Sequence, residues 1–301
     1  FSTKNPVMNG DRYALVIDGG PLLETKPNKL SSTILDYAKQ LLLNNVLPEF
    51  QYYDRIDIIF DSHKSKQIKS FTRRYPSENK QHDEYDLRMT DILDATKFQR
   101  FVHTNRSKLA SVIRRCWSDN QMIDLMPAGK RLVVASPEND TIKLTKRNTQ
   151  FSSCLCDVVL DLECDHVEAD TRLFLHVYDV QVDDHDQKPF TGVVIQSNDT
   201  DVTLLSIAHH GVINIQNYYI KKFNNCNRTS MFINVKAIGK ILKTKWGVDE
   251  QNILLTLHSI SGCDTTSFIR YVTKRNLFST YLSNIDQFKD LVLFGTSPDI
   301  K

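Results

Sequence analysis

The chain has 301 residues, of which 41% are hydrophobic and 25% charged, and its 38 Lys and Arg residues against 36 Asp and Glu residues give a net charge of +2. This length allows a full hydrophobic core. The balanced charge excludes both a generally basic nucleic-acid coat protein and an acidic tail protein, so any nucleic-acid contact must come from local clusters of charge.

The six cysteines are scattered along the chain, and no two of them form a C-x-x-C pair. Reduced thiols in an intracellular protein, nuclear or cytoplasmic, are therefore expected. Cys154, Cys156, Cys164 and His166 offer zinc-ligand chemistry, but their spacing fits no zinc ribbon or finger. No apolar run reaches the roughly 20 residues of a membrane span, so no membrane partner is expected. The sequence does not begin with Met, and we therefore expect it to be a fragment of a longer protein.

The first two apolar segments each end in an aspartate. Residues 14–18 predict a strand that ends at Asp18, residues 31–47 predict an amphipathic helix, and residues 56–60 predict a second strand that runs into Asp61. A right-handed strand–helix–strand unit makes its two strands parallel neighbours. We therefore expect the two aspartates to emerge side by side.

A basic segment follows Asp61. If it is helical, Lys66, Lys69 and Arg73 lie on one face. An isolated charge run is more often a solvated surface. Its position beside Asp61 favours contact with a nucleic-acid backbone instead.

The middle of the chain predicts a helical insertion followed by a return to the sheet. Residues 63–130 are charged and helical in pattern, and no Gly/Pro/Ser linker bounds them, so a cap or arch over the sheet is expected. Residues 131–136 then predict a strand that pairs with residues 141–144 as a hairpin. Residues 156–162 form another short apolar run.

Two acidic residues open the next helix. Glu168 and Asp170 lie in the first turn of an apolar helix at residues 173–177, where acidic side chains commonly complement the helix dipole by about 0.3 to 1 kcal/mol each. Residues 179–188 predict a polar acidic loop with no evident chemistry.

A third strand end carries the most prominent acidic pair. Residues 193–195 predict a buried parallel strand that stops at a polar turn, and Asp199 and Asp201 follow. Ligands of open α/β sheets bind beyond the carboxyl ends of the strands. This strand end is therefore the predicted centre of the chemistry.

The last third alternates short segments. Residues 202–209 and 235–246 predict helices, and residues 212–216 predict a short strand. Residues 253–260 are mostly apolar and lead to Asp264. This aspartate is again expected at the end of an apolar stretch.

Each of these aspartates alone is more often a helix N-cap than a metal ligand. Together, in a parallel sheet, they would project into one crevice and repel one another by up to about 4 kcal/mol per close pair at an effective dielectric near 20. Oxygen ligands without Cys or His favour Mg²⁺ or Mn²⁺, and two such ions roughly 4 Å apart can clamp a phosphodiester. The predicted ligands are Asp18, Asp61, Glu168, Asp170, Asp199, Asp201 and Asp264.

The motifs VIDGG, IIFDS, EADT, NDTD and SGCD, in this order, resemble those of the flap endonuclease and PIN-like 5′ nuclease superfamily. The motifs EADT, DTDV and GCDTTS are most similar to those of an uncharacterised branch of this superfamily, found in animal genomes and mobile-element-like genes. The resemblance covers residues 13–275. It implies an α/β fold with a central, mainly parallel sheet flanked by helices, as one nuclease-like domain over residues 1–301 with a C-terminal helical part at residues 235–290.

The resemblance also implies roles. The protein would be a metal-dependent nuclease with two Mg²⁺ or Mn²⁺ ions, acting on flapped or single-stranded DNA, or on RNA, with DNA the preferred partner. Lys69 and Arg73 or Arg74 match approximately the basic residues that contact the scissile phosphate in the family. One metal would be held by Asp18, Asp61 and the Glu168/Asp170 pair, and the other by Asp170, Asp199 and Asp201, with Asp264 acting partly through water.

Two departures from the family stand out. Asp170 occupies a position that is usually glutamate. The family's glycine-containing helical hairpin, which grips duplex DNA after the final aspartate, has no counterpart between Gly262 and Gly295. Lys274 and Arg275 are the residues in this region that could still contact a backbone.

Two other readings compete. Residues 199–203 also fit the D-x-D-x-[TV] nucleophile loop of haloacid-dehalogenase-type phosphatases, but the later G-D-x-x-x-D of that family is missing. The second alternative is a catalytically inactive, nuclease-derived protein that binds nucleic acid or acts as a scaffold. Seven carboxylates without metal would hinder binding of a polyanion, which favours the nuclease.

Overall fold

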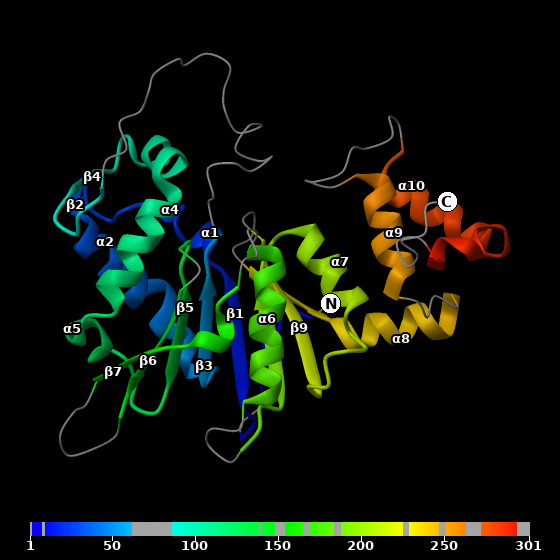
Figure 1. The fold of residues 1–301 in the computed structure, drawn as a ribbon, viewed down its shortest axis with the longest axis horizontal. Helices are drawn as coiled ribbons and strands as arrows, with labels where there is room; N and C mark the ends of the chain where they lie inside the picture. The colour runs from blue at the N-terminus through cyan, green and yellow to red at the C-terminus, as the bar shows by residue number, and fades with distance from the viewer. Residues whose placement is uncertain are drawn as a thin grey trace. The chain divides into compact units, whose positions relative to one another are not determined.

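The computed structural model, shown in Figure 1, describes residues 2–7, 10–61, 86–138, 140–147, 154–164, 169–183, 188–224, 229–246, 251–262 and 272–293. The described residues between 5 and 196 form a larger compact unit, and residues 2–4 with those from 197 onward form a smaller one. The single domain over residues 1–301, its insertion at 63–130 and its C-terminal part at 235–290 stay predictions.

The larger unit is built on a parallel sheet. Its described strands lie in the order β8-β1-β3-β5-β6-β7, and the pairs β8–β1, β1–β3 and β3–β5 are parallel, whereas β6 and β7 continue the sheet antiparallel. The predicted α/β class and the predicted hairpin after residue 131 are confirmed. The strands are β1 (Tyr13–Asp18), β3 (Arg55–Ile59), β5 (Arg131–Ala135), β6 (Thr141–Lys146), β7 (Cys154–Val158) and β8 (Gly192–Gln196).

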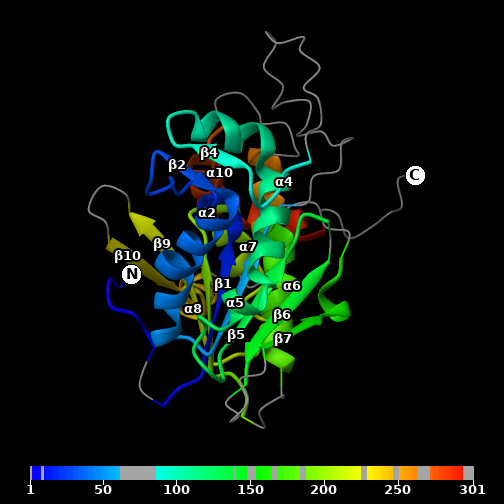
Figure 2. The ribbon, with the colours of Figure 1, turned by 90° about the vertical axis from the view of Figure 1, so that its left-hand side faces the viewer.

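Helices cover both faces of the parallel strands, which explains why β1, β3, β5 and β8 are almost wholly buried. Right-handed crossovers place α2 (Ile34–Leu41) and α4 (Phe98–Trp117) on one face and α6 (Ala169–Val182), which returns in the opposite direction, on the other. Figure 2 shows α2 and α6 on opposite sides of β1.

Local signals set the boundaries of α2 and its contact with α4. Thr33 and Asp36 form a capping box, in which the Thr33 hydroxyl accepts from the Asp36 N–H at 3.1 Å and the Asp36 carboxylate accepts from the Thr33 N–H at 3.3 Å. Trp117 of α4 is fully buried and donates its indole N–H to the Ala38 carbonyl at 2.8 Å. Figure 1 shows the two helices side by side.

The sequence prediction was wrong for residues 31–33, which were placed in the helix. They form β2 (Ser31–Thr33), which pairs antiparallel with β4 (Ile92–Asp94), a strand inside the segment predicted to be helical. The reason is tertiary pairing between distant segments, which local periodicity does not show. The remaining short elements of this unit are α1 (Gly19–Leu22), η1 (Leu42–Val46), η2 (Leu47–Gln51), α5 (Asn120–Ile123) and η3 (Leu160–Leu162).

The smaller unit packs helices around its own core of Leu242, Ile253, Leu257 and Tyr281. The predicted helices at residues 202–209 and 235–246 are confirmed. The strand predicted at residues 212–216 is wrong, because the strand begins at Asn217 instead. The elements are α7 (Thr200–Ala208), the antiparallel β9 (Asn217–Asn224) and β10 (Thr229–Asn234), α8 (Val235–Trp246), α9 (Gln251–Ser261), α10 (Lys274–Ser283) and η4 (Ile285–Leu293).

The apolar segment before Asp264 is helix α9 and not a strand. A run of eight mostly apolar residues fits a buried helix as well as a buried strand, so the sequence pattern alone does not decide between the two. Within the described parts of the chain, no helix is long and apolar enough to cross a membrane.

A buried network of charges joins α6 to the sheet. Arg55 on β3 donates two hydrogen bonds of 2.8 Å to Asp57 on the same strand, and it also pairs with Asp179 at 2.6 Å and Asp183 at 2.9 Å. His176 of α6, which is fully buried, contacts the Asp57 carboxylate at 2.7 Å. Residues 179–182 were predicted to lie in a loop, but they belong to α6, and Asp179 faces the sheet.

The same network extends to the neighbouring strand, because Arg131 of β5 pairs with Asp183 at 2.8 Å. Burial alone would raise the pKa of Asp57, but Arg55 and His176 outweigh it and hold that pKa at about 2. The Asp57 carboxylate is thus held ionised by its two partners. Removing one charged side chain from such a network leaves its partners buried with fewer counter-charges.

We predict that Asp57→Ala lowers the free energy of unfolding by about 3 to 5 kcal/mol, because His176 would lose its contact with the carboxylate and Arg55 would lose two of its hydrogen bonds inside the protein. Urea unfolding at neutral pH, followed by circular dichroism, measures the change. The control is Asp157→Ala, whose half-exposed carboxylate pairs with Lys143 at 3.8 Å and should contribute at most about 1 kcal/mol. Equal losses in the two variants would contradict the structural role of the network.

Candidate functional site

Asp18 and Asp61 lie at the carboxyl ends of adjacent parallel strands, as predicted. Asp18 ends β1 in register with Ile59 of β3, and Asp61 follows two residues later. Each carboxylate also begins a helix. The Asp18 Oδ1 accepts from the Gly20 N–H at 3.0 Å and caps α1, and the Asp61 Oδ1 accepts from the Ala169 N–H at 2.8 Å, at the first residue of α6.

A buried arginine fixes the start of α6 against the strand ends. Arg172 is fully buried and donates from one nitrogen, Nη1, to the Phe60 carbonyl at 3.0 Å and the Ser136 carbonyl at 2.8 Å. Burial lowers the pKa of its guanidinium. These bonds hold the first turn of α6, which carries Asp170, at the ends of β3 and β5.

In the smaller unit, Asp199 caps α7. Its Oδ1 accepts from the Asp201 N–H at 2.7 Å, so the common use of an aspartate after a strand is realised here too. Lys222 of β9 approaches the same turn, with its ammonium 3.3 Å from the Asp199 carbonyl oxygen and 3.4 Å from that of Asn198. Burial lowers the pKa of Lys222, partly offset by Asp199.

Asp201 faces two groups that can carry positive charge. Its Oδ1 is 2.9 Å from the Lys274 ammonium, and its Oδ2 is 3.7 Å from Nε2 of His258. Burial lowers the pKa of His258, while Asp201 acts in the opposite direction. The carboxylate is only 19% exposed, so it needs a cation as a partner.

Capping does not exclude metal binding by these aspartates. Each cap uses one oxygen, whereas an ionised carboxylate offers about four acceptor positions. Among the described residues, however, no three His, Cys, Asp or Glu side chains are arranged to hold one metal ion, and this holds also for Cys154, Cys156 and Cys164. The seven-ligand set therefore stays a prediction. Glu168, Asp264, Lys69, Arg73 and Arg74 lie outside the described residues, as does His166.

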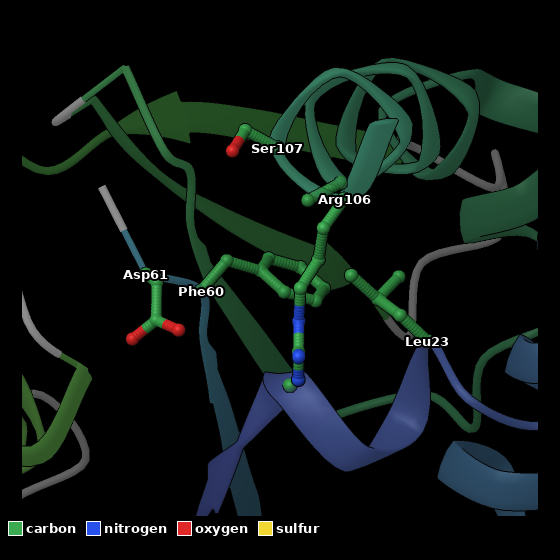
Figure 3. A pocket seen from close by; sticks show the side chains of 7 residues that line it. Leu23, Phe60, Asp61, Arg106 and Ser107 are labelled. Carbon is green, nitrogen blue, oxygen red and sulfur yellow. The ribbon is translucent and has the colours of Figure 1, made fainter. Parts of the chain in front are cut away.

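Sequence reasoning missed Arg106, which reaches the site from α4. Figure 3 shows its side chain running from α4 down to α1, with Asp61 on the far side of Phe60. A small pocket is lined by Gly20, Leu23, Phe60, Asp61, Arg106, Ser107 and Ala110. The sequence signal that could have indicated this contact is the Gly-Gly pair directly after Asp18, because glycine lets another side chain approach the backbone closely.

No protein-family model and no curated protein sequence match the chain. Among solved structures, it is similar to a bacteriophage T5 flap endonuclease in complex with DNA and metal ions, at 10% sequence identity and a TM-score of 0.40, covering 94% of this chain and 86% of that one. It is also similar to a T5 5′-exonuclease with bound zinc, at 11% identity and a TM-score of 0.40, covering 96% of this chain and 82% of that one.

We predict that Asp61→Ala and Asp61→Asn differ in stability. The alanine removes the acceptor for the Ala169 N–H and should lower the free energy of unfolding by about 0.5 to 2 kcal/mol, whereas the asparagine keeps an acceptor oxygen and should stay close to the wild type. Chemical denaturation of the three proteins measures this. If the two variants were equally stable, the contact with α6 would contribute nothing as a cap.

Proposed function

We propose that the protein is a divalent-metal-dependent nuclease that hydrolyses phosphodiester bonds. The observation that carries the proposal is the position of Asp18 and Asp61 at the carboxyl ends of two adjacent parallel strands, with the first turn of α6 bonded to Asp61. This edge is where open α/β sheets bind ligands. The half-buried carboxylates of Asp18, Asp61 and Asp170 are hard oxygen donors, which suit Mg²⁺ or Mn²⁺.

The surroundings of Asp201 support a second cation-binding carboxylate. Its carboxylate has the Lys274 ammonium as its counter-charge, and a metal ion bound there would replace that ammonium. Asp199 follows the last residue of β8 by three residues, and so short a stretch of chain spans at most about 11 Å.

The proposed division of ligands follows the sequence motifs. One ion would be held mainly by Asp18, Asp61 and the Glu168/Asp170 pair, and the other mainly by Asp170, Asp199 and Asp201, with Asp264 acting partly through water. Bound ions would stabilise the attacking and leaving oxygens of the phosphodiester. The protein's own contribution is orientation, because the caps on Asp61 and Asp199 and the bonds of Arg172 fix the backbone from which the carboxylates project.

The proposed substrate is single-stranded or flapped DNA, in preference to RNA. Its backbone would be held by local basic residues, since the net charge of +2 supplies little general attraction. We assign Lys69, Arg73 and Arg74 to this contact. The basic side chains act by binding phosphate and orienting it, a role that needs no titration near neutral pH.

We predict that the purified protein with millimolar Mn²⁺ cleaves at least one of four labelled substrates, namely single-stranded DNA, duplex DNA, flapped DNA and RNA. Asp61→Asn and Asp201→Asn should each reduce the rate by about 100-fold or more, equivalent to ~2.7 kcal/mol of transition-state stabilisation. Product formation on denaturing gels with and without EDTA is the measurement.

Asp157→Asn is the matched control, because its carboxylate is half exposed on β7 and should leave the rate unchanged. Cleavage that persists at the wild-type rate in both site variants would refute the assignment. Binding of the substrates without cleavage would favour the inactive nucleic-acid-binding protein instead.

A further inference from the structure

Gly20 leaves room for the guanidinium of Arg106. A Cβ atom on Gly20 would lie 3.3 Å from Arg106 Cζ and only 2.3 Å from its Nη2, and the second distance is shorter than real Cβ contacts. The same point is 3.1 Å from Asp18 Oδ1. The guanidinium and a proposed metal ligand therefore flank one position, and a larger residue there would have to displace the guanidinium.

Helix α4 is kinked next to Arg106. The helix loses helical geometry at Asn105, with φ −119° and ψ 21°, one residue before Arg106. The Asn105 side-chain amide donates to the Phe101 carbonyl at 3.2 Å. A sharp break of this kind redirects the residues that follow it. The Arg106 side chain thus projects from α4 directly after the residue at which the helix is kinked.

Among the residues that the structure describes, Arg106 has only a weak ion pair. Its Nη1 is 3.6 Å from Glu24 Oε1, and the Glu24 side chain is 65% exposed. Exposed pairs of this kind contribute about 0 to 1 kcal/mol and exchange easily. The guanidinium has five N–H donors in a planar fork, which matches the oxygens of a phosphate. At 26% exposure, the side chain is held in place and still reaches solvent.

We propose that Arg106 binds a non-bridging oxygen of a nucleic-acid phosphodiester in the pocket beside Asp61, a phosphate subsite that adjoins the strand-end carboxylates. This inference rests on the proposed nuclease function. Asp61 lines the same pocket and would repel a phosphate there unless a cation neutralised it. Binding at the subsite therefore depends on the divalent metal, which separates it from general surface binding of a polyanion.

The test is fluorescence anisotropy with labelled single-stranded DNA in Ca²⁺ and in EDTA, which reports binding independently of cleavage. Arg106→Ala should weaken binding about tenfold in Ca²⁺, which corresponds to ~1.4 kcal/mol. It should also reduce the slope of log Kd against log salt by about 1, because one phosphate contact is lost. In EDTA the variant and the wild type should bind equally.

Three further variants make the result specific. Arg106→Lys keeps the charge without the fork and should give an intermediate loss. Gly20→Ala keeps the arginine but displaces its guanidinium, so it should weaken binding like Arg106→Ala. Arg115→Ala removes an exposed charge from the same helix and should change nothing. Circular dichroism and thermal unfolding confirm that each variant is folded.

Unchanged affinity and salt slope in Arg106→Ala would overturn the subsite, as would an equal loss in Arg115→Ala. A wild-type protein that binds DNA through Arg106 in Ca²⁺ but never cleaves in Mn²⁺ would refute the nuclease and keep the subsite. Cleavage that is lost in Asp61→Asn but unaffected by Arg106→Ala would refute the subsite and support the nuclease.

Discussion

The larger unit depends on how α6 is tied to the sheet at both ends. At one end, His176 and Asp179 join the buried charges of Arg55 and Asp57. At the other, Arg172 holds the carbonyl ends of two strands, and Asp61 accepts from the first residue of the helix. Charges buried this way are costly unless every partner is in place, so α6 has one register on the sheet. That register brings its acidic first turn to the strand ends.

The side chains that cap helices are also the proposed metal ligands. A single aspartate in the sequence therefore does not distinguish a helix cap from a metal ligand. A carboxylate that caps a helix has its orientation fixed by a backbone N–H, which leaves further acceptor positions on its oxygens. Asp61 and Asp199 both have this arrangement. Asp201 differs because Lys274 supplies its counter-charge. A divalent cation would have to displace that ammonium, so the ion pair itself marks where positive charge is favoured.

Much of the fold could be predicted from the sequence, because its signals are local. Runs such as ALVID and IDIIF end in aspartates, and their parallel pairing follows from the handedness of the crossover. The buried network could not be predicted, since Asp57 and His176 are 119 residues apart. Its only local trace is the alternation of Arg55 and Asp57 on an otherwise apolar strand. Arg106 was missed for the same reason, because its contact with α1 joins distant segments.

The most direct measurement of the central claim is anomalous diffraction from crystals grown with Mn²⁺. We predict manganese peaks within about 2 to 2.5 Å of carboxylate oxygens of Asp61 and Asp201. In the same maps, Lys274 should have moved away from Asp201. Manganese bound only elsewhere, or no manganese while Lys274 stays paired with Asp201, would contradict it.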